Sequence, residues 1–337
     1  MRALWVFSWL LASALPLVAA AQPVADFYAK TRLTVMVSFP PGDTYDLYGR
    51  LVAKHIVKYL PGNPGFVVEN QAGAGGRLLA NQLYGAAPRD GSVLGLVNQG
   101  VPTDEALDQP GVRLKSKEFA WIGSPFTPVN VIFVWHTAPV REFKDLLTHE
   151  LIVGATGPSS PNYIYARILN GVLGTHFKII TGYPGTGELN QSIEHGEIYG
   201  RVGVSWTSVK NTSDWVATGK VRVLAQIGLA RDPDLPQVPL LQEIANDPKD
   251  RSLLEFMSYS TAMGRPFLVP PGVPAERVEA LRRAFDRAMK DPELLAEAQK
   301  ARLDIAPMSG EELQALVAKT VDTPAEIRKR ARDAMGL

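Results

Sequence analysis

The stretch 38-SFPPGDTYDLYGR-50 decides the fold. An apolar run, Leu33 to Val37, precedes it, and an amphipathic run, Leu47 to Leu60, follows it. The prolines and the glycine between these runs indicate a strand that ends in a tight turn and a helix that begins directly afterwards. A helix start leaves the N–H groups of its first turn without partners inside the helix. The stretch therefore raises the question of what those N–H groups bind.

The same strand–turn–helix order recurs along the chain. Further apolar runs lie at 65–69, 93–97, 130–135, 151–155, 177–181 and 221–227. Strands that alternate with helices predict parallel βαβ units, in which ligands lie beyond the carboxyl ends of the strands. Glycine-rich turns open a helix in both halves of the chain, which indicates two lobes that face one cleft; these turns are 73–76, 157–160 and 182–187.

The chain begins with the pattern of a secretory signal peptide. Arg2 supplies a positive charge, Leu10 to Val18 an apolar segment, and Ala19-Ala20-Ala21 a small-residue cleavage site. The alternative is a membrane anchor, for which this apolar segment is short. We therefore expect cleavage after Ala21 and a periplasmic protein that is soluble afterwards.

Composition excludes several classes of function. The formal net charge is +1, and removal of residues 1–21 leaves 34 basic against 34 acidic residues, which gives no electrostatic reason to expect nucleic acid as a partner. The chain has no cysteine, which excludes thiol catalysis, disulfides and thiolate metal sites.

The two aspartates of the opening stretch admit two interpretations. Asp43 fits the helix N-cap, and Asp46 then occupies the third helical position, where a carboxylate suits the positive end of the helix dipole. Both residues then only cap the helix. The other interpretation is that this helix start also presents N–H groups to an anionic ligand.

No catalytic, metal or cofactor motif is complete. The five histidines show no HExxH-like spacing, and the turn at 73–76 lacks the Lys-Ser/Thr of a P-loop. In 157-GPSSP-161 a proline replaces the last glycine of a hydrolase elbow, so a hydrolase that uses Ser159 or Ser160 stays only as an alternative. We expect no catalytic residue, no metal and no cofactor.

Three arginines lie near the candidate loops. Arg50 is two turns into its helix and is expected to pair with a neighbour, whereas Arg77 follows a glycine turn and is able to face a solute. Arg201 lies in an apolar run, and a buried arginine needs either a ligand carboxylate or a protein acid as partner. Tyr45, Tyr183 and Trp206 are candidates for an aromatic wall, although Trp206 equally fits the core.

The C-terminal third has proline-rich and helical patterns. Prolines crowd the stretch 229–244, which indicates a rigid segment that crosses between lobes. Pro274 fits the first turn of a helix, and Ser309 with Glu312 forms a capping box ahead of a further helix.

The opening stretch resembles the first ligand loop of the Bug family, the solute receptors of tripartite tricarboxylate transporters. The residues that carry this likeness are Pro40, Pro41, Gly42, Asp46 and Arg50. Other stretches resemble the same family in order and spacing: 67-VVENQAGAGG-76, 88-PRDGSVL-94, 238-VPLLQEI-244 and 267-FLVPPGVPAERVEALRRAFDRAMKDPE-293.

The resemblance implies a two-lobed type II periplasmic-binding-protein fold, a Venus flytrap, with a mainly parallel sheet flanked by helices in each lobe. We expect residues 22–124 and 229–305 in lobe 1, residues 125–228 in lobe 2, and residues 306–337 packed across or onto lobe 2. The lobes would close about segments near 123–129 and 226–232 on a small carboxylate solute. A membrane transporter of two integral subunits would receive the solute; a membrane signalling protein is the alternative recipient.

The resemblance also implies that the loops at 39–46 and 156–160 grip the solute. The family usually has a second glycine where this chain has Asp43, so either Asp43 turns onto its helix or the solute brings a cationic or hydroxyl group to it. The expected ligand-binding residues are Phe39, Pro41, Gly42, Asp43, Thr44, Tyr45, Asp46, Gly75, Arg77, Thr156, Gly157, Ser159, Ser160, Tyr183, Gly185, Thr186, Arg201 and Ser205.

Overall fold

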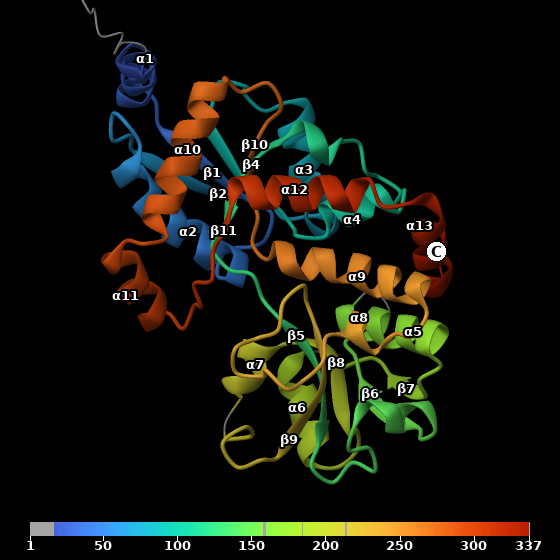
Figure 1. The fold of residues 1–337 in the computed structure, drawn as a ribbon. Helices are drawn as coiled ribbons and strands as arrows, with labels where there is room; N and C mark the ends of the chain where they lie inside the picture. Colours follow the sequence, from blue (N-terminus) through green and yellow to red (C-terminus); the bar gives the residue numbers. More distant parts are fainter. Residues whose placement is uncertain (1–16, 158–159, 184, 213, 337) are drawn as a thin grey trace, which may run out of the picture.

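Two separate β-sheets, each flanked by helices, make up the molecule (Figure 1). The computed structural model describes residues 17–157, 160–183, 185–212 and 214–336. The two-lobed α/β fold expected from the sequence is confirmed. No helix within these ranges has the length and apolar character needed to cross a membrane.

The first sheet has the strand order β11-β4-β10-β3-β1-β2. Its strands are β1 (Leu33–Val37), β2 (Phe66–Asn70), β3 (Val93–Leu96), β4 (Ala120–Ser124), β10 (Phe267–Val269) and β11 (Met308–Ser309). β1 is parallel to both β2 and β3, whereas β10 runs antiparallel between β3 and β4. Because Phe267 at the start of β10 pairs with Leu96 at the end of β3, β10 begins at the edge where the parallel strands end.

The second sheet has the order β7-β6-β8-β5-β9. Its strands are β5 (Asn130–Trp135), β6 (Leu151–Gly154), β7 (Phe177–Ile180), β8 (Gly200–Ser205) and β9 (Val221–Ile227). β6 is parallel to β7 and β8, and β5 is antiparallel to β8 and β9, with Asn130 opposite Ser205. Most strands of each sheet run in one direction, as expected, and the strands that run against them are β10 and β11 in the first sheet and β5 in the second. β5 and β10 enter their lobes from the edge where the parallel strands end.

Helices cover both faces of the two sheets. Those beside the first sheet are α1 (Leu17–Lys30), α2 (Thr44–Ile56), α3 (Arg77–Gly85), α4 (Val101–Ala106), α10 (Ala275–Ala288) and α11 (Pro292–Lys300). Those beside the second sheet are α5 (Pro161–Leu173), α6 (Thr186–Glu194) and α7 (Trp206–Lys210). Short 3-10 helices are η1 (Val57–Tyr59), η2 (Ala74–Gly76), η3 (Ser116–Glu118) and η4 (Phe143–Leu147).

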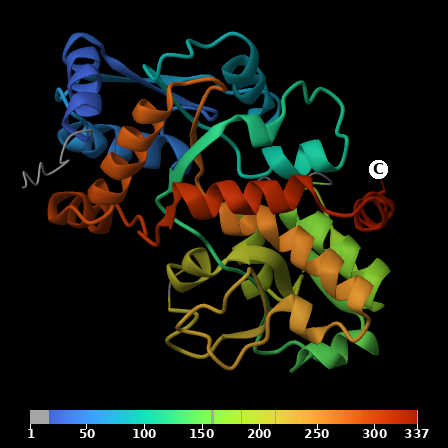
Figure 2. The same cartoon turned by 45° about the horizontal axis from the view of Figure 1, so that its top comes forward.

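The remaining helices join the lobes. They are α8 (Leu241–Ile244), α9 (Pro248–Met263), α12 (Gly310–Val321) and α13 (Ala325–Met335). α12 packs on β4 and on α9, and α13 packs on α5 and α9, so the C-terminal helices contact both lobes (Figure 2). A continuous hydrophobic cluster follows them, from Trp121 in the first sheet through Leu254 in α9 to Val202 in the second. This cluster fixes one side of the gap between the lobes.

The helix starts are built as the sequence predicts, with one shift. Ser309 and Glu312 form the reciprocal capping box at α12. Pro274 is the N-cap of α10 rather than a residue of its first turn. Residues 1–16 of the expected signal peptide lie outside the described residues, and the expected cleavage point after Ala21 falls within α1. Beyond that point, α1 buries Val24 and Tyr28 in the core.

Candidate functional site

The loop after β1 ends the strand and starts α2. Proline has no N–H group to donate, so the sheet pairing stops at Pro40 and Pro41. Gly42 has φ +82°, a conformation that side-chain-bearing residues rarely adopt, and turns the chain toward the helix. Asp43 is the N-cap and accepts from the Tyr45 N–H at 2.8 Å. The carboxylate of Asp43 is thus turned onto its helix, which is the first of the two alternatives left open by the sequence.

Asp46 holds this loop in shape. Its side chain is 3% exposed; Oδ2 accepts from the Gly42 N–H at 2.8 Å and from Arg50 Nε at 2.9 Å, and Oδ1 accepts from Asn70 at 2.8 Å. Burial acts to raise the pKa of Asp46, but the hydrogen bonds from Arg50, Gly42 and Asn70 outweigh it and lower the pKa. Asp46 therefore bonds to the protein itself, and Arg50 pairs with a neighbouring residue, as expected.

The N–H groups of this turn have separate partners. The Gly42 N–H is used by Asp46, the Tyr45 N–H by Asp43, and the Asp43 N–H by the Pro40 carbonyl at 3.2 Å. Among the described residues, the N–H groups of Thr44 and Asp46 form no hydrogen bond. These two N–H groups of the helix start are therefore available to a ligand, and the neighbouring Gly42 and Thr44 are exposed.

A second glycine turn lies beside this loop. Gly76 has φ +92°, and a Cβ there would lie 2.7 Å from Asn98 Cβ and 3.3 Å from Ser38 Oγ. Ser38, Gly76 and Asn98 therefore meet where β1, β2 and β3 end. The Ser38 side chain is 1% exposed and its Oγ has no partner among the described residues. Sequence reasoning missed Ser38 and Asn98, although both directly follow apolar runs that it identified.

An aromatic and cationic cluster lies on the same loop. The rings of Phe39 and Tyr45 stack with centroids 4.3 Å apart, and the guanidinium of Arg265 lies 4.3 Å from the Tyr45 ring centroid. Arg265 Nη1 donates to Gln99 Oε1 at 3.0 Å and to the Gly264 carbonyl at 3.1 Å. Burial raises the pKa of Tyr45, against the opposing charge of Arg265. Arg265 and Gln99 were also missed, because three segments distant in sequence bring them together.

Arg77 and Gly75 also lie at this edge. Gly75 is exposed, and Arg77 Nη1 is 3.5 Å from Asp104 Oδ2, so Arg77 has a protein acid as partner. Burial raises the pKa of Asp104, and the neighbouring Arg77 opposes that shift.

The second lobe places hydroxyl groups at its own edge. Thr156 is exposed, and Ser160 is the N-cap of α5; its Oγ donates to the Gly157 carbonyl at 2.7 Å. Ser159 lies outside the described residues. Ser160 Oγ therefore serves as a helix cap, and within the described part of the chain no histidine is bonded to it.

Arg201 is buried inside the second lobe. Its Nη1 contacts Asn190 Oδ1 at 3.3 Å, its Nε has no partner among the described residues, and burial lowers its pKa to about 10. Thr186 and Arg201 line one cavity of about 10 Å³, which is room for about one water molecule and too small for a carboxylate solute. Gly185 is the N-cap of α6, and Tyr183 packs against the core of this lobe.

Ser205 is the last residue of β8 and Trp206 the first of α7, at the end of the second lobe that meets the first. Trp206 is 4% exposed and belongs to the core, so it is not a wall of the site. Beside it, Thr207 Oγ1 donates to Asp304 Oδ2 at 2.5 Å, and the Asp304 carbonyl accepts from Tyr48 of α2 at 2.7 Å. This chain of contacts joins the starts of α2 and α7 across the lobes. A pocket of about 440 Å³ lies there, lined by the crossing segments 126–129, 230–234 and 304–306.

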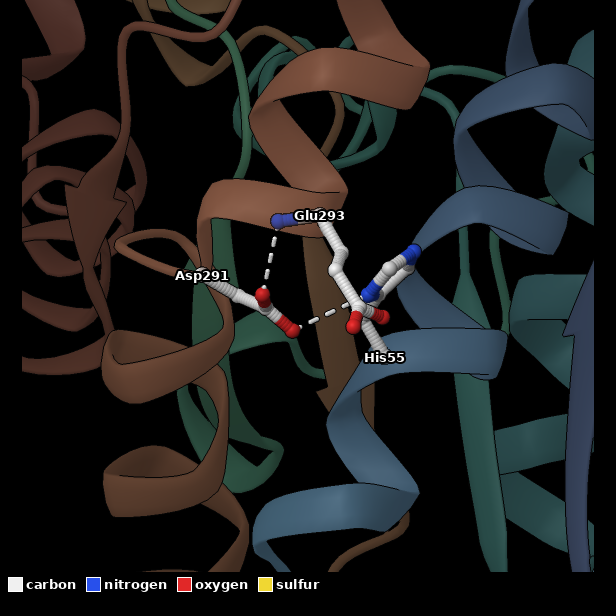
Figure 3. Close-up of side chains that lie close together, drawn as sticks. All are labelled: His55, Asp291 and Glu293. Carbon is white, nitrogen blue, oxygen red and sulfur yellow. Dashed lines mark hydrogen bonds and ion pairs between the residues drawn. The ribbon is translucent and has the colours of Figure 1, made fainter.

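A cluster of possible metal ligands lies at the other end of α2 (Figure 3). The ligand atoms of His55, Asp291 and Glu293 lie within 4.8 Å of one another. The ammonium group of Lys58 is 2.6 Å from Glu293, 3.4 Å from Asp291 and 3.1 Å from His55 Nδ1, so a cation already occupies this cluster. Glu297 contacts His55 Nε2 at 3.1 Å. The cluster therefore ties α2 to α11, about 18 Å along α2 from its start.

Comparison with known proteins gives consistent results. The sequence profile of the "Tripartite tricarboxylate transporter family receptor" matches residues 49–332. A protein of Agrobacterium vitis, described as a UPF0065 protein in an intergenic region, is 30% identical over 291 residues, which cover 84% of this chain and 78% of that protein.

Two solved structures resemble the whole fold. One is a TctC solute-binding protein from Polaromonas without ligand, with TM-score 0.72, 23% identity, and coverage of 91% of this chain and 99% of that one. The other is MatC from Rhodopseudomonas palustris with bound malate, with TM-score 0.58, 21% identity, and coverage of 91% and 99%. At these identities the structures show a common fold.

Proposed function

Since this chain belongs to the family of tripartite tricarboxylate transporter receptors, which are periplasmic solute-binding proteins, we propose that it captures a small carboxylate solute between its two lobes. The observation that carries the proposal is the start of α2. Two unbonded N–H groups, those of Thr44 and Asp46, lie at the carboxyl edge of a parallel sheet, where an anion is stabilised by both the N–H groups and the helix dipole. The bound malate of MatC, which has the same fold, supports a carboxylate as solute.

The proposed binding residues fall into two groups. In lobe 1 the exposed loop atoms of 39–46 and the turn at Gly75 offer the first contacts. In lobe 2, Thr156, Gly157 and Ser205 lie at the facing edge and would close on the solute. We do not place Arg201 or Tyr183 in the site, because Arg201 is buried in lobe 2 and the half-buried Tyr183 packs against the hydrophobic core of that lobe.

Closure would occur about the segments that cross between the sheets. Only residues 125–129 separate β4 from β5, and β9 ends at Ile227 before the chain returns toward α8. A hinge of a few residues at element ends is the usual device for such a motion. The closed form would be the one read by a membrane transporter of two subunits, after export and cleavage of the signal peptide. The receptor role involves binding and closure, without a catalytic step.

A thermal-shift screen of the mature protein tests the proposal. The panel contains malate and other C4 to C6 dicarboxylates, citrate, aromatic acids, amino acids and uncharged diols as controls. A ligand at a hundredfold excess over its Kd stabilises the folded state by about 2.7 kcal/mol. We expect at least one carboxylate to raise the Tm in a concentration-dependent way while the diols do not. Stabilisation by uncharged or cationic compounds alone would refute a carboxylate receptor.

A further inference from the structure

Arg265 occupies a position that matters for any anionic solute. It immediately precedes Pro266 and β10, the strand that starts where β1 and β3 end. Its guanidinium lies 4.3 Å from the ring centroid of Tyr45, inside the loop proposed to hold the solute. The backbone N–H of Arg265 donates to Ser124 Oγ at 2.9 Å, at the end of β4. Arg265 is therefore fixed from two sides at the edge where the lobes meet.

The charge of Arg265 has no acid partner. Among the described residues, no carboxylate lies within 4.0 Å of its guanidinium, whereas Arg50 and Arg77 at the same edge pair with Asp46 and Asp104. The guanidinium uses one nitrogen, Nη1, for two neutral acceptors. A partly buried cation without a counter-ion is unfavourable unless another group supplies the negative charge.

One nitrogen of Arg265 is left for a carboxylate. Among the described residues neither Nε nor Nη2 has a hydrogen-bond acceptor, but Nε is enclosed by protein atoms and shielded from solvent. Nη2 is therefore the nitrogen through which a carboxylate would form a charge-assisted hydrogen bond. The Gln99 side chain accepts from Nη1, which leaves Nη2 without a bond to Gln99.

We propose that Arg265 is the cation that binds a carboxylate of the solute in lobe 1, oriented by Gln99 and by the ring of Tyr45. This inference rests on the proposed receptor function and specifies its substrate class further: the solute carries at least one ionised carboxylate that is read by a guanidinium in addition to backbone N–H groups. The nearby Asp43 carboxylate, turned onto its helix, does not exclude such a solute because Arg265 offsets its charge.

The test is a set of binding measurements by calorimetry on wild type, Arg265→Gln, Arg265→Lys and Arg277→Gln. Arg277 is a matched control, since its guanidinium also stacks on a ring, 3.8 Å from Phe27, and bonds to a carbonyl, that of Asp90 at 2.6 Å. Each carboxylate of the panel that binds wild type is compared with its monoamides, in each of which one carboxylate group is replaced by an amide. Urea unfolding without ligand checks that every variant is folded.

We expect Arg265→Gln to weaken binding of the carboxylate about 10- to 100-fold, the range for loss of a hydrogen bond to a charged group. Arg265→Lys should lie between Arg265→Gln and wild type, and Arg277→Gln should stay within twofold of wild type. One amide should bind wild type about 10-fold more weakly than its parent acid, and this difference should disappear in Arg265→Gln, which a merely structural role of Arg265 would not cause.

Two results would overturn the inference. The first refutes the role of Arg265 alone, and the second refutes the receptor function as well. If wild type binds a carboxylate and folded Arg265→Gln keeps both the affinity and the preference for acid over amide, Arg265 does not read the carboxylate while the receptor function stands. If wild type binds no carboxylate of the panel, both the function and the role of Arg265 are refuted. Should Arg265→Gln fail to fold, the acid-to-amide comparison in Arg265→Lys gives the decision.

Discussion

The edges of the two lobes that face each other differ in how they carry charge. The lobe 1 edge has acids and cations at the loops themselves, with Asp46 and Arg50 bonded to each other and Arg265 without an acid partner in the part of the chain that the structure describes. The lobe 2 edge has hydroxyl and backbone groups, and its buried cation, Arg201, lies behind α6 in a cavity of about 10 Å³. We infer that lobe 1 recognises the charge of a solute and that lobe 2 closes over it with neutral groups. Four substitutions test this difference, two of them beside a second substitution for comparison.

The largest effect is expected at the lobe 1 loop. Asp46→Ala removes a carboxylate that is 3% exposed, leaves the Gly42 N–H without its acceptor, and takes one hydrogen bond each from the Asn70 amide and from Arg50. We expect the free energy of unfolding to fall by about 3 kcal/mol and carboxylate binding to be lost with the loop. Urea unfolding and calorimetry measure both. Asp333→Ala, which removes an exposed ion pair with Lys329, should change stability by less than about 1 kcal/mol; equal effects would contradict a special role of Asp46.

The next prediction concerns Asp291, a charged residue of lobe 1 that lies away from the edge facing lobe 2. Burial acts to raise the pKa of Asp291, but hydrogen bonds from the Glu293 N–H and His55 and the charge of Lys58 lower it from 3.8 to about 2. A depressed carboxyl pKa contributes stability above its unfolded value, and this contribution is lost as the pH falls through the folded value.

Asp291→Asn should therefore lower stability at pH 7 by about 2 kcal/mol and flatten the loss of stability that wild type shows between pH 4 and pH 2. Unfolding curves across this pH range measure the effect. Solute affinity at pH 7 should stay within twofold of wild type, because the cluster lies at the far end of α2. A large loss of affinity without unfolding would show that the two ends of α2 are coupled.

A smaller and opposite effect is expected in lobe 2. Burial lowers the pKa of Arg201, so its charge disfavours the folded state at every pH below about 10. Arg201→Met keeps a similar volume without the charge, and we expect a gain of about 1 kcal/mol in unfolding free energy with unchanged carboxylate affinity. Calorimetry of Arg201→Met and wild type measures the affinity. A tenfold loss of affinity would show that Arg201 reaches the solute, and would contradict the inference that lobe 1 alone recognises its charge.

The smallest effect concerns the N-cap of α2. Asn caps a helix as well as Asp does, so Asp43→Asn should change the unfolding free energy by less than about 0.5 kcal/mol. Loss of the negative charge should raise the affinity for a carboxylate about twofold, because repulsion between two like charges that water separates is weak. Ser160→Ala, at the matched cap in lobe 2, should lower stability by about 1 kcal/mol. A fall in affinity for Asp43→Asn would mean that Asp43 contacts the solute.

Local patterns predicted most of the strands and helix starts. The runs at 33–37, 130–135 and 221–227 are strands at those positions, and the caps at Asp43 and Ser309 form as predicted. β10 was missed because three buried residues between two prolines give no periodicity. β11, with two residues, gives even less.

The sequence by itself determined the family, the two-lobed fold and the loop at 38–50, because a strand end, a proline pair and a helix cap are properties of neighbouring residues. The tertiary structure decided which charges are free. Arg265 is next to Tyr45 only because β10 enters the sheet between β3 and β4, 220 positions later in the chain. Arg201 looked equally available in sequence, yet β8 buries it beside Asn190. Whether a cation is paired depends on contacts between distant segments, and no local pattern contains that information.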